Sequence, residues 1–265
     1  MYSKFQLTKK FLHYYLASSN GKGHGIHSPF VFDFIKNVLN DSKTYSCYKP
    51  IEQKRKDLLR NFTIIEVEDF GAGSAVIKTN KRVIANMATT SLKPKKYAQL
   101  LCRMVNYYSP KTIVELGTSF GITSTYLASA LSPSTVFTCE GSDAIAAVAK
   151  QNFDDLKFKN IHITIGDFNK TLSPLLTRLK TVNFAFVDGN HLKKPTITYF
   201  TELLKYSNVN TILIFDDIHW SIEMEEAWAV IKQHPIVTLT LDLFFLGIVF
   251  FNTDFNHKQH FTIRF

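Results

Sequence analysis

From residue 112 onward, short runs of β-branched and aromatic residues alternate with stretches whose apolar residues recur at helical spacing. This alternation is typical of βαβ units, which build a parallel sheet. The expected strands are Thr112–Leu116, Val136–Cys139, Ile161–Ile165, Phe184–Val187, Thr211–Phe215, Val237–Asp242 and Ile248–Phe251, with helices beginning near Ile122, Asp143, Leu172, Thr196 and Glu223. Too few residues separate the last two strands for a crossover helix, so they pair as an antiparallel hairpin. The sequence predicts an α/β fold with a seven-stranded, mostly parallel sheet that ends in this hairpin.

The residues before this alternation have a different pattern. Helices are expected over Phe5–Ser18, Phe30–Leu39 and Glu52–Arg60, and the helix Pro94–Tyr108 opens the next segment. At 265 residues the chain has the length of one α/β domain with an appendage. We therefore expect a basic, mainly helical N-terminal cap over residues 1–93 and a larger domain over residues 94–265.

The positive charge of the chain is concentrated in its N-terminal part. Residues 1–110 hold 18 Lys and Arg against 7 Asp and Glu, whereas residues 111–265 hold 13 against 15. Such a segment favours an anionic partner, which could be RNA, a phosphorylated or CoA-linked small molecule, or a membrane surface. A basic face that serves solubility alone explains the charge as well.

Composition and hydropathy exclude several classes of protein. An apolar fraction of 45% and a charged fraction of 20% are not those of a disordered chain. The longest apolar run, residues 243–251, is much shorter than the about 20 residues of a membrane span, and no signal-peptide pattern is present. We expect a soluble, cytoplasmic protein with no membrane span. Cys47, Cys102 and Cys139 lack the spacing of a zinc site or a disulfide framework, so buried free thiols are expected.

A glycine-containing turn follows the first expected strand of the sheet. In Glu115-Leu-Gly-Thr-Ser-Phe-Gly121, the glycines permit a tight turn and a close approach of the backbone to a ligand. The next strand ends in Glu140, about 20 residues further on, where a carboxylate can accept both hydroxyls of a ribose. The turn lacks the Lys-Ser/Thr of a P-loop and the third glycine of a dinucleotide fingerprint. A nucleoside without phosphates is therefore expected, and S-adenosylmethionine fits that description.

These motifs resemble those of the class I S-adenosylmethionine-dependent methyltransferases, specifically the small-molecule O-methyltransferases of the catechol and caffeoyl-CoA type. The resemblance covers about residues 97–251 and implies a Rossmann-like fold. It implies that the turn holds the methionine part of the cofactor, that Glu140 holds the ribose, and that Asp167 and Phe168 contact the adenine. The cofactor-binding residues so implied are Glu115, Gly117, Thr118, Ser119, Gly121, Glu140, Asp167, Phe168 and Asp188.

Acidic residues also follow the fourth and fifth expected strands. Asp188 and His191 lie after the fourth strand, and Asp216 and Asp217 lie after the fifth. Such strand ends face one crevice in an open α/β sheet. In the resembling O-methyltransferases, two Asp and an Asn at these places hold magnesium, and a Lys acts as the base. Here Asp217 replaces the Asn and His191 replaces the Lys, so Asp188, Asp216 and Asp217 are the candidate ligands of Mg²⁺ or another divalent cation.

Without a cation, the charge of three nearby carboxylates has to be relieved in another way. One carboxyl could take up a proton, or Lys193, Lys194 and His219 could neutralise the group. Both alternatives stay open at the level of the sequence.

The predicted reaction is the transfer of a methyl group to a hydroxyl of a small-molecule acceptor. The sulfonium already activates the methyl group, so the protein has to position the acceptor and remove its proton. An imidazole, with a usual pKa of about 6.5, suits that task near neutral pH. Asp188 and His191 are therefore the catalytic candidates, and the basic cap suggests an anionic acceptor.

Two other functions are compatible with the sequence. The first is an RNA methyltransferase that acts on a ribose hydroxyl and uses the basic N-terminal segment to bind its substrate. The second is a non-catalytic protein that binds S-adenosylmethionine without turnover.

Residues 68–74, Glu-Asp-Phe-Gly-Ala-Gly-Ser, form a second turn of methyltransferase type. No strand ending in an acid follows it at the required distance. We expect a turn or a substrate-side loop there rather than a cofactor site.

Overall fold

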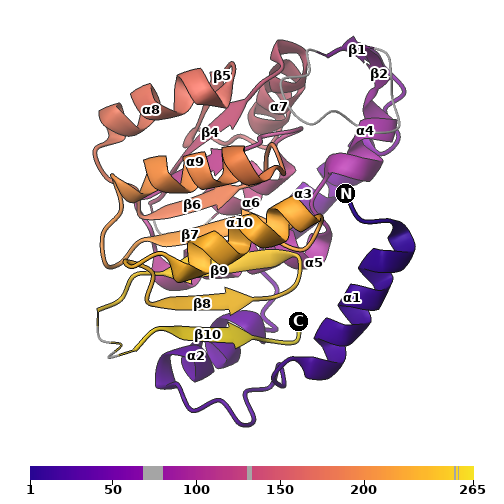
Figure 1. The fold of residues 1–265 in the computed structure, drawn as a ribbon. Coiled ribbons are helices and arrows are strands. Elements are labelled where there is room, and N and C mark those ends of the chain that lie inside the picture. Colours follow the sequence, from indigo (N-terminus) through magenta and orange to yellow (C-terminus); the bar gives the residue numbers. More distant parts are fainter. Residues whose placement is uncertain (68–79, 130–132, 254, 256) are drawn as a thin grey trace. The chain divides into compact units, whose positions relative to one another are not determined.

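The computed structural model of the chain describes residues 1–67, 80–129, 133–253, 255 and 257–265 (Figure 1). The second turn of methyltransferase type, residues 68–74, lies outside the described residues. Contacts divide the chain into two compact units. The middle unit comprises residues 42–178, and the split unit comprises residues 1–41 together with residues 179–265. The expected boundary at residues 93 and 94 stays a prediction.

In its described residues, the middle unit contains five strands and the helices that connect them. Its helices are α3 (Tyr48–Leu58), α4 (Ile84–Ser91), α5 (Lys95–Tyr108), α6 (Ile122–Ala128), α7 (Asp143–Asp155) and α8 (Phe168–Leu179), the last of which ends one residue beyond the unit. Its strands are β1 (Ile64–Glu66), β2 (Lys81–Val83), β3 (Thr112–Leu116), β4 (Thr135–Glu140) and β5 (Ile161–Ile165). Strands β3, β4 and β5 pair in parallel in that order, while β1 and β2 form a separate antiparallel pair.

The apolar face of helix α5 belongs to the hydrophobic core of the middle unit. The apolar residues that the sequence places at helical spacing in α5 are all buried: Tyr97, Leu100, Leu101, Met104 and Val105. The neighbouring positions Ala98 and Cys102 belong to a cluster that also contains Ile51 of α3 and Tyr126 of α6. The amphipathic pattern therefore fixes which face of α5 is turned inward.

The split unit contains the remaining elements. They are α1 (Lys4–Ala17), α2 (Pro29–Phe34), the π-helix η1 (Ile35–Leu39), β6 (Phe184–Val187), α9 (Lys193–Leu204), β7 (Ile212–Asp216), α10 (Ile222–Gln233), β8 (Leu239–Asp242), β9 (Leu246–Phe250) and β10 (Gln259–Thr262). The strand order within this unit is β10-β8-β9-β7-β6. Strands β6 and β7 run parallel, as do β8 and β10, whereas β9 is antiparallel to β7 and β8. Helices α9 and α10 lie side by side (Figure 1).

The α/β fold, the mostly parallel sheet and the antiparallel β8–β9 hairpin are all confirmed. Within the split unit, strand β10 pairs with β8 and was not expected. The segment Gln259–Thr262 alternates half-buried and exposed residues and lacks an apolar run, so periodicity did not reveal it. No helix in the described part of the chain is both long and apolar enough to cross a membrane. All three cysteines are free thiols; Cys102 and Cys139 are buried as expected, whereas Cys47 is only partly buried.

A network of charged side chains holds α1 within the split unit. His219 Nδ1 lies 3.0 Å from Glu225 Oε1, and His219 Nε2 lies 2.8 Å from Asp242 Oδ2. Glu225 also accepts hydrogen bonds from Lys10 Nζ at 2.9 Å and from Tyr2 Oη at 2.7 Å. Burial opposes a charged imidazole, but the two carboxylates outweigh burial and raise the pKa of His219. The network therefore links α1 to α10 and β8.

We expect His219→Ala to lower the free energy of unfolding by about 1–3 kcal/mol, because two partly buried carboxylates lose their donor. The pKa of His219 is raised in the folded protein, so this stabilisation is complete at acidic pH and is lost as pH rises through the raised value. The difference between the variant and the wild type should therefore shrink at alkaline pH. Urea unfolding at a series of pH values measures it.

The matched control is His24→Ala, because His24 is exposed. That variant should unfold as the wild type does at every pH. If the cost of His219→Ala did not depend on pH, the ionic link would be contradicted.

Candidate functional site

The turn after β3 is held in its shape by the end of β4. The backbone N–H groups of Gly117 and Thr118 donate to the carbonyl of Cys139 at 3.0 and 3.1 Å. Gly117, Ser119 and Gly121 have φ values of 101°, 48° and 78°, so the chain reverses over a few residues in the left-handed region. Helix α6 then begins at Ile122, with Gly121 as its N-cap residue, as the sequence predicts.

Glu140 is the last residue of β4, and its carboxylate accepts a hydrogen bond from this turn. Its Oε2 accepts a hydrogen bond from the N–H of Ser119 at 2.8 Å, and its Oε1 accepts one from the N–H of Ser142 at 3.1 Å. The residue is only 9% exposed. Burial raises the pKa of Glu140, while the backbone N–H groups act in the opposite direction and are outweighed. A carboxylate offers about four lone-pair sites, so Glu140 keeps acceptor capacity for an incoming hydroxyl donor beside the backbone N–H groups of Ser119, Gly141 and Ser142.

Glu115 lies beneath the turn rather than at its rim. It is fully buried, and its Oε2 accepts hydrogen bonds from the hydroxyls of Ser124 and Thr138. Thr138 Oγ1 is also 2.6 Å from Thr118 Oγ1. The carboxylate is thus part of a hydroxyl network that joins β3, β4, α6 and the turn. These contacts give Glu115 a structural role that its place in a glycine motif did not predict.

Asp167 and Phe168 follow β5 at the start of α8. Asp167 Oδ1 accepts hydrogen bonds from the N–H of Asn169 at 2.9 Å and from its side-chain amide at 3.0 Å. Asp167 therefore caps the helix, which is a common task for Asp in this position. Phe168 is half-buried. Both residues are on the middle unit, with the glycine turn and Glu140.

Ser91, the last residue of α4, contacts the turn after β3. Its hydroxyl lies 3.1 Å from the hydroxyl of Ser119, which brings the end of α4 to the turn. A serine at the end of a short helix carries no distinguishing pattern, so no sequence signal pointed to it.

Gly121→Ala should destabilise the protein through packing as well as through backbone strain. A Cβ at Gly121 would lie 2.3 Å from Cε1 of Phe153, whereas Gly25 has a similar φ of 80° and open space around it. We expect about 1–2 kcal/mol from backbone strain in both variants and about 1–3 kcal/mol more from overpacking in Gly121→Ala. Chemical denaturation of Gly121→Ala and Gly25→Ala provides the comparison. If both variants lost the same free energy of unfolding, the expected overpacking of Gly121→Ala against Phe153 of α7 would be contradicted.

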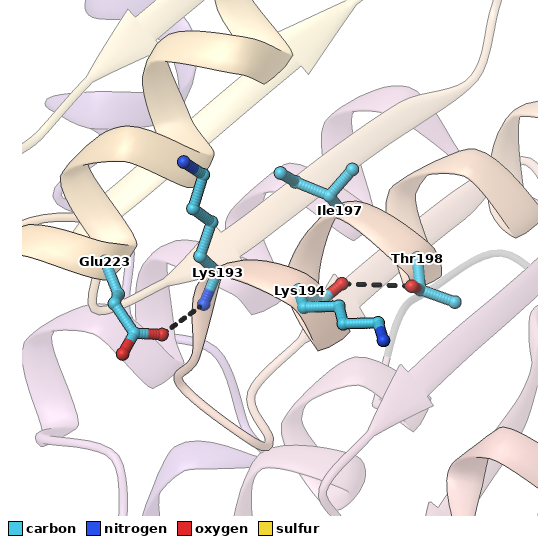
Figure 2. A pocket seen from close by; sticks show the side chains of 5 residues that line it. All are labelled: Lys193, Lys194, Ile197, Thr198 and Glu223. Carbon is cyan, nitrogen blue, oxygen red and sulfur yellow. Dashed lines mark hydrogen bonds between the residues drawn. The ribbon is translucent and has the colours of Figure 1, made fainter.

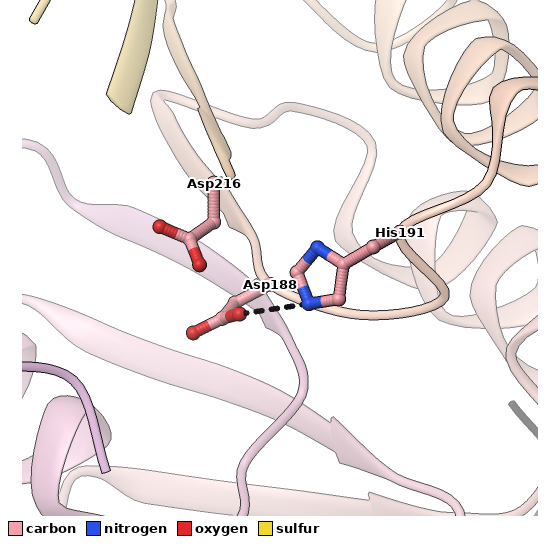
Figure 3. Close-up of side chains that lie close together, drawn as sticks. All are labelled: Asp188, His191 and Asp216. Atoms are coloured by element: carbon pink, nitrogen blue, oxygen red, sulfur yellow. Dashed lines mark ion pairs between the residues drawn. The ribbon is translucent and has the colours of Figure 1, made fainter. Parts of the chain in front are cut away.

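A second group of predicted residues gathers in the split unit. Asp188 follows β6, His191 lies in the loop before α9, and Asp216 ends β7. One ligand atom from each lies within 4.8 Å of the others (Figure 3). His191 Nε2 is 3.5 Å from Asp188 Oδ1, and Asp216 is 1% exposed. We call this group the acid–histidine cluster.

The acid–histidine cluster contains the donor atoms that a divalent cation prefers. Two carboxylates and one imidazole are compatible with Mg²⁺, Mn²⁺ or Zn²⁺. Ligand atoms on one cation lie within about 3 to 4.5 Å of one another, because each metal–ligand bond is about 2.0–2.4 Å long. The observed spacing is close to that range, so the residues fit a cation.

Asp217 is not a member of this cluster. It has a φ of 53°, and its N–H donates to the carbonyl of Phe245 at 2.7 Å, which turns the chain toward β9. The structure therefore brings together Asp188 and Asp216 as predicted, with His191 in the third place. Adjacent residues after a strand point in different directions, and sequence alone could not say which of the two acids would join the cluster.

Two of the three candidate counter-charges, Lys193 and His219, are paired with other acids. Lys193 Nζ pairs with Glu226 at 2.9 Å, and His219 pairs with Glu225 and Asp242. Lys194 is exposed. His191 lies beside the two acids of the cluster.

An open pocket of about 420 Å³ lies at α9 and α10. Its lining is Lys193, Lys194, Ile197, Thr198 and Glu223 (Figure 2). The N–H of Lys193 donates to Glu223 Oε2 at 3.1 Å, and the hydroxyl of Thr198 donates to the carbonyl of Lys194 at 3.0 Å. None of the cluster residues lines this pocket, so it is a surface feature beside the loop of His191.

The chain is similar to known proteins both in sequence and in fold. Residues 114–218 match the model of a methyltransferase domain family. No curated protein matches the sequence. Several solved structures share the fold.

An O-methyltransferase from Bacillus cereus, in complex with SAH, is 19% identical with a TM-score of 0.55, and the match covers 83% of this chain and 97% of that one. The SAH-bound methyltransferase PaMTH1 of Podospora anserina is 12% identical with a TM-score of 0.58, over 85% and 97% of the two chains. The O-methyltransferase TomG of Streptomyces achromogenes, involved in tomaymycin synthesis and in complex with SAM, is 15% identical with a TM-score of 0.56, over 82% and 95%. At these identities the likeness concerns the fold.

Proposed function

We propose that this chain, which carries a class I methyltransferase domain over residues 114–218, is an S-adenosylmethionine-dependent O-methyltransferase that acts on a hydroxyl of a small-molecule acceptor. The observation that carries the proposal is the buried carboxylate of Glu140, fixed by the N–H groups of Ser119 and Ser142 at the end of β4. In this position a carboxylate can accept both hydroxyls of a ribose.

The cofactor residues that we propose all belong to the middle unit, except for Asp188. The turn from Gly117 to Gly121 would take the methionine part of S-adenosylmethionine, and Asp167 and Phe168 would take the adenine. Glu115 would act through the turn, because its carboxylate bonds the hydroxyls of Ser124 and Thr138. These residues bind and orient the cofactor, and the sulfonium supplies the activated methyl group.

The acid–histidine cluster supplies the groups for deprotonation. In the proposed step the acceptor oxygen attacks the methyl carbon, the bond from carbon to sulfur breaks, and S-adenosylhomocysteine leaves. The hydroxyl proton passes to a ring nitrogen of His191. Asp188, 3.5 Å from His191 Nε2, orients the ring and stabilises its positive charge, which leaves Nδ1 to take the proton.

A divalent cation would give His191 a different task. Asp188, His191 and Asp216 would hold the ion, which would supply a Lewis acid that favours the ionised acceptor. An imidazole bound to a cation through one nitrogen cannot also be paired with Asp188 through that nitrogen. We favour His191 as the base because it is already paired with Asp188.

His191→Gln should lower kcat by about 10²-fold or more, because a positioned general base contributes about 10² to 10⁴. The rate of S-adenosylhomocysteine formation with a panel of catechols, phenols and aliphatic alcohols measures it. His24→Gln is the matched control, since His24 is an exposed histidine on a different loop. An unchanged rate in His191→Gln would contradict the role of base. Cofactor binding without turnover of any acceptor would favour the non-catalytic alternative.

Treatment with EDTA should leave the rate of the wild type unchanged if His191 is the base. Binding of Mg²⁺ or Mn²⁺ is followed separately by the shift in Tm, which does not depend on turnover. A rate that falls with EDTA and recovers with Mg²⁺, together with a Tm shift lost in Asp216→Asn, would assign the cluster to a cation.

The ribose-hydroxyl alternative is motivated by the excess of 18 Lys and Arg over 7 Asp and Glu in residues 1–110. It requires RNA binding that weakens as salt rises. The absence of a gel shift at low salt and micromolar protein would exclude it.

A further inference from the structure

We propose that the outer face of α1 docks on an anionic lipid surface. We define the outer face of α1 as the exposed apolar side chains Phe5, Leu12 and Leu16 with the flanking Lys4 and Lys9. The three apolar side chains are 79%, 57% and 72% exposed. This proposal does not depend on the proposed enzymatic function.

Helical geometry places the three apolar residues on one side. Positions 5, 12 and 16 differ by seven and four residues, so their side chains lie one above the other. The opposite side of α1 is engaged within the split unit. Tyr14 is buried and donates to the carbonyl of Ile263, and the Phe11 ring is 5.1 Å from that of Phe244. The outer face is therefore held outward by the packing of the inner one.

The helix is also fixed at its N-terminal end before any docking. Ser3 and Gln6 form a capping box, and the N–H of Tyr2 donates to the carbonyl of Trp220 at 3.0 Å. Lys10 is committed to Glu225. Docking would consequently use a preformed helix and would not have to order it.

Charge identifies the kind of surface that fits. The first 32 residues contain four lysines and no Asp or Glu. Lys4 and Lys9 are exposed and lie on either side of the apolar stripe. Lysines that flank an apolar stripe can reach anionic headgroups while the stripe enters the boundary of the acyl chains.

A second copy of the chain fits this face less well. In a two-fold dimer the same patch meets itself, so Lys4 and Lys9 would face their own counterparts. The described part of α1 offers no acidic side chain to compensate them. An anionic lipid surface neutralises these lysines and covers the apolar stripe at the same time.

The experiment is co-sedimentation of the full chain with vesicles of phosphatidylglycerol and phosphatidylcholine in equal amounts, compared with phosphatidylcholine alone. We expect binding to the anionic vesicles that weakens as salt rises. The variant Phe5→Ser/Leu12→Ser/Leu16→Ser should lose binding by about tenfold or more. Lys4→Gln/Lys9→Gln should bind more weakly and with less dependence on salt.

The matched control is Phe62→Ser/Ile222→Ser/Ile236→Ser, which removes apolar side chains of 77%, 63% and 56% exposure outside α1. It should bind as the wild type does, and equal Tm values establish that both triple variants are folded. Equal loss of binding in the control, or no binding of the wild type, would overturn the proposal.

A wild-type dimer in sedimentation equilibrium that the α1 variant converts to a monomer, without vesicle binding, would assign the face to a second copy. RNA binding lost in Lys4→Gln/Lys9→Gln without vesicle binding would also overturn it.

Discussion

The hydrogen bond from the N–H of Ser119 to Glu140 Oε2, at 2.8 Å, is the interaction on which the middle unit's candidate site depends. It joins the turn after β3 to the end of β4. The bond is possible because β3 and β4 are parallel and in register, with Leu116 opposite Cys139. It also requires the positive φ values of the turn, which let the Ser119 N–H face the carboxylate. A glycine-containing turn and a strand-end acid, about 20 residues apart in sequence, are thus joined into a single structural element.

The same principle operates at the other strand ends, within each unit. In the middle unit, Asp167 follows β5 and caps α8. In the split unit, Asp188 follows β6 and Asp216 ends β7, and parallel pairing of these strands brings the two acids close to His191. Parallel strands collect polar side chains at their carboxyl ends because every strand points the same way. The buried strands form a rigid scaffold, and the strand ends and short loops carry the candidate site residues.

Much of the fold could be predicted from the sequence because its strong signals are physical ones. Seven expected strands correspond to β3–β9, and strands such as Phe184–Val187 stand out as fully buried apolar runs. Strand β10 and helix α4 were missed, since the Gln259–Thr262 segment is half-exposed and the Ile84–Ser91 segment is short and rich in Thr. Local propensity is weak in such segments, and tertiary contacts decide their structure.

The candidate site was predictable to a different degree. Asp188, His191 and Asp216 could be found because strand ends can be found. The third member of the acid–histidine cluster could not be predicted beside the two acids. The backbone directions in two loops decide whether Asp217 or His191 takes that place. The links of His219 to Asp242 and Glu225 were equally invisible, since they join residues 23 and six positions apart on different elements. The number of residues between two positions does not show whether their side chains point toward each other.

The most direct test of the account is a calorimetric titration of the protein with S-adenosylhomocysteine, for the wild type and for Glu140→Ala. The account predicts micromolar binding by the wild type and its loss in the variant, with an unchanged far-UV circular dichroism spectrum. No binding by the wild type, or equal binding by both proteins, would contradict the assignment of the Glu140 carboxylate and the turn after β3 as the cofactor site.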